Sequence, residues 1–91
     1  MLKVDEFYKA EKLVDEIIED TPIDNIQSVL ENATTSFSEK TRRMFYIHLS
    51  SLFLNVIPNR LEELGREAET KATRAMQAIT YLVNANQIKY V

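Results

Sequence analysis

The residue with the clearest chemical potential in this chain is His48, the only histidine among its 91 residues. Histidine is the side chain that ordinarily changes charge near neutral pH. His48 shares one side of a predicted helix with Ser51 and Asn55, which follow it by three and seven residues. An exposed histidine on such a helix could carry a phosphoryl group, so the spacing raises phosphotransfer as one candidate function.

The sequence around His48 resembles the central segment of histidine phosphotransfer domains, which are small helical bundles with an exposed histidine on a helix. The resemblance rests on IHLSSL at 47–52 and RLEELGRE at 60–67, less than a quarter of the chain. It implies that His48 would carry the phosphoryl group. Those domains place a lysine and a glycine just after the histidine, whereas this chain has Ser51 and Leu52. We therefore expect a structural histidine, hydrogen-bonded at a helix interface, and keep phosphotransfer as a remote alternative.

Other catalytic and metal-binding patterns are missing from the sequence. The chain has no cysteine, no glycine-rich phosphate-binding motif and no pair of histidines at helical spacing. The di-iron pattern of helical bundles needs a glutamate three residues before a histidine, and Phe45 occupies that position. Glu67 and Lys71 have the spacing of a surface ion pair instead. We expect no enzymatic activity, no cofactor and no bound metal.

The composition predicts one all-α domain that spans residues 1–91. Hydrophobic residues make up 45% of the chain and charged residues 27%, as in a compact domain. The apolar positions recur every three or four residues, and a single glycine leaves few positions for hairpin turns. We expect a bundle of four or five helices, with two longer C-terminal helices and two short N-terminal ones.

Four helices are predicted from the apolar pattern, over residues 3–19, 22–33, 38–57 and 66–85. Thr21 is a candidate N-cap for the second helix, and Ser36 or Ser38 for the third. Pro58 either kinks the third helix or begins a new segment, and Gly65 marks a second weak point. The two long helices should form an antiparallel pair, with the two short helices packed across it.

The third predicted helix is apolar over an arc of about 200°, twice the width that one contact face requires. Such a helix must be covered on two sides, and the rest of this small chain offers little cover. We therefore expect a homodimer or higher oligomer with a symmetric interface. The expected interface residues are Phe45, Tyr46, Leu49, Leu52, Phe53 and Val56.

Charge is unevenly distributed along the chain. Residues 1–33 carry nine acidic and three basic side chains, whereas residues 34–91 carry eight basic and five acidic ones. The two parts could attract each other between chains, or the basic part could bind nucleic acid. A pI of about 5.1 and the scatter of the basic residues make nucleic acid the alternative. The candidate contacts for it are Lys40, Arg42, Arg43, Arg60, Arg66, Lys71 and Arg74.

No targeting or membrane segment is expected. Lys3, Asp5 and Glu6 interrupt the first apolar residues, and the uncharged stretch 44–59 is too short and too polar to span a bilayer. We expect a cytoplasmic protein that does not bind membranes. The function expected from the sequence is a non-catalytic interaction or scaffold module that associates with itself and, as a further option, with another protein.

Overall fold

The fold is a bundle of four helices without strands in the part of the chain that the computed structural model describes, residues 2–87. Within that range, the side chains of residues 56–62, 64, 86 and 87 are not described. The all-α class is thus confirmed. None of the helices in this range is both long and apolar enough to cross a membrane.

Helix α1 spans Val4–Glu19 and buries one face. At its start, the Glu6 carboxylate accepts a hydrogen bond of 2.9 Å from the backbone N–H of Lys3. At its end, the hydroxyl of Thr21 donates to the carbonyl of Glu16 over 3.1 Å. Thr21 therefore closes α1, and the prediction that it caps the second helix was wrong.

Helix α2 spans Ile26–Ala33 and follows the short 3-10 helix η1, Ile23–Asn25. Pro22 precedes η1 in extended conformation, with φ of −62° and ψ of 146°. Ile26 and Leu30 are the buried residues of α2, one turn apart on the same face. This short helix thus contributes a narrow apolar stripe.

Helix α3, Glu39–Gln87, consists of two arms that meet at Gly65. We call residues 39–64 the first arm and residues 66–87 the second arm. Of the two predicted caps, Ser38 is confirmed, because its Oγ accepts a hydrogen bond of 3.2 Å from the backbone N–H of Thr41. The first arm continues through Pro58 with helical backbone, so of the two alternatives left open at Pro58 the structure has the longer helix, which extends beyond residue 57.

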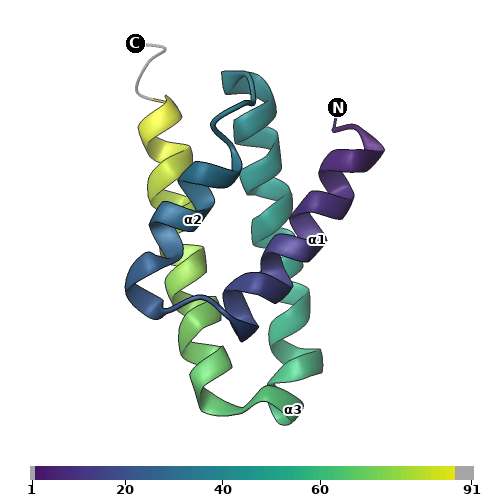
Figure 1. The fold of residues 1–91 in the computed structure, drawn as a ribbon, viewed down its shortest axis with the longest axis vertical. Helices are drawn as coiled ribbons and strands as arrows, with labels where there is room; N and C mark the ends of the chain where they lie inside the picture. The colour runs from purple at the N-terminus through teal and green to yellow at the C-terminus, as the bar shows by residue number, and fades with distance from the viewer. Residues whose placement is uncertain (1, 88–91) are drawn as a thin grey trace.

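The two arms of α3 fold back on each other as an antiparallel pair (Figure 1). A continuous helix of 49 residues would be about 74 Å long, whereas the longest extent of the molecule is 41 Å. The reversal takes place at Gly65, whose φ of 82° and ψ of −172° fall in a region that is almost restricted to glycine. The sequence left open whether the chain turns at Pro58 or at Gly65, and the turn lies at Gly65.

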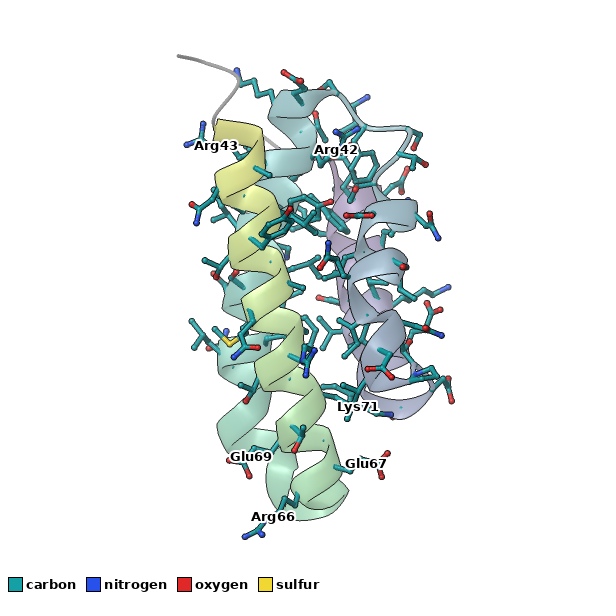
Figure 2. All side chains as sticks on the ribbon, turned by 90° about the vertical axis from the view of Figure 1, so that its left-hand side faces the viewer. Arg42, Arg43, Arg66, Glu67, Glu69 and Lys71 are labelled. Carbon is teal, nitrogen blue, oxygen red and sulfur yellow. The ribbon has the colours of Figure 1, made fainter. Side chains whose placement is uncertain are left out.

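Helices α1 and α2 cover the same face of this helical hairpin. Figure 1 shows α1 crossing the first arm and α2 running beside the second arm, and Figure 2 shows the resulting two layers from the side. The end of α1 also reaches the second arm, where Lys71 binds the backbone of Ile18. The predicted arrangement, a long antiparallel pair with the N-terminal helices packed across it, is confirmed.

Buried side chains from α1, α2 and both arms of α3 form one hydrophobic core. The second arm contributes four alanines, Ala68, Ala72, Ala75 and Ala78, to its buried face. Small side chains let a helix approach its neighbours closely. The larger residues of the core are Leu13, Val14, Ile17, Ile18, Ile26, Leu30, Phe45, Tyr46, Leu49, Phe53, Ile79 and Leu82.

The premise of the predicted dimer interface was wrong for most of its residues. Phe45, Tyr46, Leu49 and Phe53 are each at most 1% exposed within one chain. Leu52 is half-buried, and Val56 lies outside the described side chains. Helices α1 and α2 together with the second arm enclose this face within one chain, so the expectation that the rest of the chain offers little cover for it was wrong. In this conformation the four buried residues cannot contact a partner.

Lys71 holds the end of α1 onto the second arm. Its ammonium group is buried and donates a hydrogen bond of 3.3 Å to the carbonyl of Ile18, in the last turn of α1. The Nζ atom also lies 3.8 Å from Oε1 of the exposed Glu67, at the predicted i, i+4 spacing. A cation is favourable at a helix C-terminus because the last carbonyl groups carry partial negative charge.

Replacement of this lysine should destabilise the fold. We expect Lys71→Ala to lower the free energy of unfolding by about 1 to 2 kcal/mol, because the Ile18 carbonyl loses a charged donor. Arg74→Ala is the matched control, since Arg74 is exposed on the same arm. Urea unfolding followed by circular dichroism measures both, and equal midpoints for the two variants would contradict the role given to Lys71.

Candidate interaction surface

Several large apolar side chains remain exposed although the core is complete. Val4 and Phe7 on α1 are 66% and 37% exposed, and Ile47 and Leu54 on the first arm are 52% and 58% exposed. We call these four residues the α1–α3 surface. Scattered exposed apolar residues are normal, but neighbouring ones are a signature of binding sites.

The two helices of this surface meet where Phe7 packs against His48. The ring centroids of the two residues lie 4.7 Å apart, and the rings are nearly perpendicular at 85°. Val4 precedes Phe7 by about one helical turn, and Ile47 adjoins His48 in sequence. Ile47 and Leu54 are seven residues apart, which places them on the same side of the first arm. The ring contact thus joins the apolar residues of α1 to those of α3.

Charges of opposite sign accompany the two halves of this surface. On α1, the exposed Glu11 follows Phe7 by four residues and lies on the same side of the helix. On the first arm, the exposed Lys40 and the half-buried Arg43 precede Ile47 by seven and four residues. The α1 half therefore has an acid at Glu11, with the exposed Lys3 four residues before Phe7, and the α3 half is bordered by base.

His48 contributes to this surface as a packing residue. Its ring is half-buried against Phe7, and Ser51, on the same side of the helix, donates its hydroxyl to the Ile47 carbonyl over 3.5 Å. The structure thus brings an aromatic ring against the imidazole. Phosphotransfer through His48 stays a prediction that this geometry does not test.

The residues predicted to contact nucleic acid are dispersed over the molecule. Figure 2 shows Arg42 and Arg43 near one end of the bundle and Arg66 and Lys71 toward the other. Arg42 and Lys71 bind backbone carbonyls of the protein itself. Arg66 and Arg74 line one open polar hollow on the second arm, Lys40 is exposed near the start of the first arm, and the side chain of Arg60 is outside the described part.

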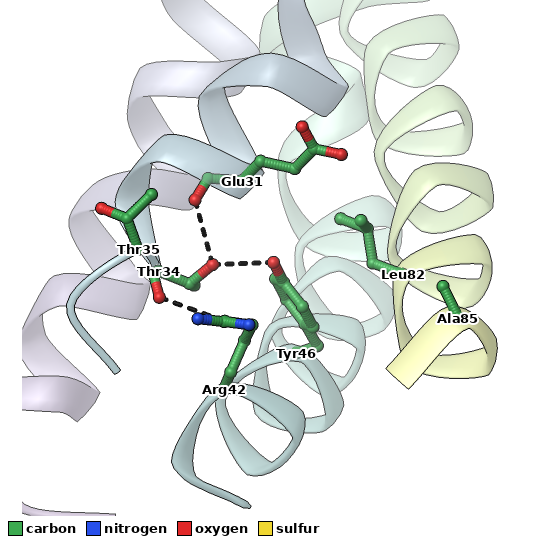
Figure 3. A pocket seen from close by; sticks show the side chains of 7 residues that line it. All are labelled: Glu31, Thr34, Thr35, Arg42, Tyr46, Leu82 and Ala85. Carbon is green, nitrogen blue, oxygen red and sulfur yellow. Dashed lines mark hydrogen bonds between the residues drawn. The ribbon is translucent and has the colours of Figure 1, made fainter. Parts of the chain in front are cut away.

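A second candidate site is the hollow between the end of α2 and both arms of α3, shown in Figure 3. It measures about 320 Å³, within the range of small-molecule sites. The residues around it are Glu31, Thr34, Thr35, Arg42, Tyr46, Leu82 and Ala85. Whether the hollow can recognise a ligand depends on which of its polar groups are still available.

The polar groups at the base of this hollow are engaged with one another. The hydroxyl of Thr34 lies 3.2 Å from the carbonyls of Leu30 and Glu31 and 2.7 Å from the hydroxyl of Tyr46. A hydroxyl has one proton, so when Thr34 donates to these carbonyls, Tyr46 donates to Thr34. This cluster therefore ties the end of α2 to the first arm.

Arg42 completes this connection. Its Nε donates to the carbonyl of Thr34 and its Nη2 to the carbonyl of Phe37, each over 3.2 Å. The guanidinium thus fixes the connection between α2 and α3. Sequence analysis missed this role, since Arg42 was grouped with the candidate nucleic-acid contacts and Thr34 was not singled out. The only signal was the phenol of Tyr46, which had to find a hydrogen-bond partner if buried.

Burial raises the pKa of Tyr46 above its ordinary value of 10.0, and the Thr34 hydrogen bond and the nearby Arg42 charge oppose this shift. The folded chain therefore holds the phenol proton more tightly than the unfolded chain does. The stabilising contribution is complete below pH 10 and is lost as the pH rises from there through the raised pKa.

We expect the stability of the wild-type protein to fall relative to Tyr46→Phe as the pH increases above about 10. At neutral pH the same variant should be less stable by about 1 kcal/mol, because one buried hydrogen bond is lost. Urea titrations between neutral and alkaline pH measure both effects. Tyr81→Phe, at an exposed position, is the control, and a stability difference between wild type and Tyr46→Phe that is independent of pH would count against the assignment.

Neither a metal site nor a known relative points to another function. Among the side chains that the structure describes, no three acidic or histidine residues lie close enough together to hold a metal ion. Comparison with known proteins found no matching family model, no matching curated protein and no matching solved structure. The α1–α3 surface therefore remains the candidate site of this chain.

Proposed function

We propose that this protein is a non-catalytic interaction or scaffold module that forms a homodimer through the α1–α3 surface. The observation that supports this most directly is the exposure of Val4, Phe7, Ile47 and Leu54 beside a core that one chain completes. None of these four residues belongs to the core cluster, so packing within one chain does not explain their large apolar side chains. Burial against a partner would remove their apolar area from water.

The distribution of charge favours a second copy of this chain as the partner. In a two-fold interface the same surface is used by both copies, so each half of the surface faces the other half of its partner. The acidic border at Glu11 would then face the basic border at Lys40 and Arg43 of the second copy. Complementary potentials of this kind favour correct pairing and speed association.

The size of a stable interface indicates how much of the surface must take part. A standard protein interface covers about 800 Å² on each partner, roughly one seventh of the 5962 Å² accessible surface of this chain. Four side chains cannot supply that area. The proposed contact therefore extends along α1 and the first arm and includes their charged borders.

Two added charges should disrupt this dimer. We expect the wild-type protein to be dimeric at tens of micromolar and the double variant Ile47→Glu with Leu54→Glu to be monomeric. Both positions are more than half exposed, so glutamate is compatible with the fold. Native mass spectrometry and light scattering report the mass, and circular dichroism confirms that the variant is folded.

The matched control is Thr73→Glu with Thr80→Glu, which places two glutamates at the same seven-residue spacing on the exposed side of the second arm. This control should remain dimeric. A wild-type protein that is monomeric at hundred-micromolar concentration contradicts the proposed function. A dimer that persists in the Ile47 and Leu54 variant shows that association uses another surface.

A further inference from the structure

The turn between the two arms of α3 is unusually short. Helical backbone extends up to residue 64 and resumes at residue 66, so that Gly65 alone reverses the chain. Its φ of 82° and ψ of −172° are accessible to glycine and strongly disfavoured for other residues. If Gly65 took helical dihedrals instead, the two arms would become one continuous helix and the second arm would leave its own bundle.

Space around this glycine is open. A Cβ atom placed on Gly65 would meet no atom within 4 Å. A residue other than glycine at this position would therefore have unfavourable backbone dihedrals, but its Cβ atom would clash with no neighbouring atom. The closed hairpin and the opened helix thus differ chiefly in the conformation of one residue.

We propose that two copies of this chain exchange their second arms, so that each arm completes the bundle of the other copy. The arm would bring the same contacts that it makes within one chain. Ala72, Ala75 and Ile79 would enter the same core, and Lys71 would donate to the Ile18 carbonyl of the other copy. Exchange of an identical element preserves every buried interaction and is a low-cost route to a dimer.

The site that receives the second arm identifies its partner as another copy of this chain. Its base is a core shaped around an arm with alanines at four buried positions. Its rim holds the Ile18 carbonyl, which accepts a hydrogen bond from a lysine at one position of that arm. A helix of different sequence would lose one of these matches, whereas a second copy retains both.

The hinge is a single residue, and short hinges favour exchange because the same core contacts can form between two chains once the hinge is extended. Association opposes it through the loss of translational freedom, so exchange should depend on concentration. This inference goes beyond the proposed function. It uses the hinge and the core face of the second arm, and it does not depend on the α1–α3 surface.

Gly65→Ala tests the hinge directly. Alanine disfavours the closed dihedrals and favours a continuous helix. We expect this variant to be dimeric, with a dissociation constant at least about tenfold lower than that of the wild-type protein. The control is a variant that keeps Gly65 and has three glycines inserted after it. The longer turn should reduce exchange.

A chemical cross-link distinguishes exchange from ordinary association. Gln27 and Gln77 are exposed and line the same hollow between α2 and the second arm. The natural chain has no cysteine, so Gln27→Cys with Gln77→Cys introduces a unique pair for a short bismaleimide. In an exchanged dimer the two cysteines at each hollow belong to different chains, and denaturing electrophoresis then shows a covalent dimer. In any other dimer the link stays within one chain.

A covalent dimer from cross-linked Gly65→Ala supports exchange. A monomeric Gly65→Ala, or a dimer whose links all lie within single chains, overturns it. If Gly65→Ala does not fold, the wild-type sequence with the cysteine pair is refolded at several hundred micromolar, and the absence of links between chains then overturns the proposal. When Ile47→Glu and Leu54→Glu are added to the cross-linkable Gly65→Ala variant, the links between chains should remain, which separates this inference from the proposed surface contact.

Discussion

The whole bundle depends on covering the aromatic face of the first arm. Phe45, Tyr46, Leu49 and Phe53 present more apolar surface than one neighbouring helix can enclose. The chain solves this by reversing at Gly65, which places the second arm on one side, and by laying α1 and α2 over the remaining side. The positions of all other elements follow from that requirement, including the exposure of Ile47 and Leu54 on the side of the first arm that is left uncovered.

Apolar packing fixes which faces are buried but is poorly directional, so polar contacts complete the arrangement. At one end of the bundle, Lys71 connects the second arm to the last turn of α1. At the other end, Thr34, Tyr46 and Arg42 connect α2 to the first arm. The two groups act on different helices. Together they fix the register of both N-terminal helices against the hairpin.

Much of this architecture could be predicted from the sequence, because the positions of apolar residues on a helix determine which face is buried. The inner faces of α1 and α2, the alanine face of the second arm and the cap at Ser38 belong to this part. The site was harder to predict. A wide apolar arc shows that a helix has several neighbours, but it does not reveal whether they come from the same chain. Arg42 was missed because its partners are backbone carbonyls, which leave no trace in residue types. Thr34 was missed because the sequence does not show which side chain a buried phenol will meet.

The alanine face of the second arm has a consequence for how readily the arm can change its position. A long side chain loses rotamer entropy each time it is buried, whereas alanine has no side-chain rotamers to lose. Four of the buried residues of this arm are alanines. These four positions therefore lose no side-chain rotamers when the helix docks, and the rotamer entropy that docking costs on this face falls on Lys71, Ile79 and Leu82.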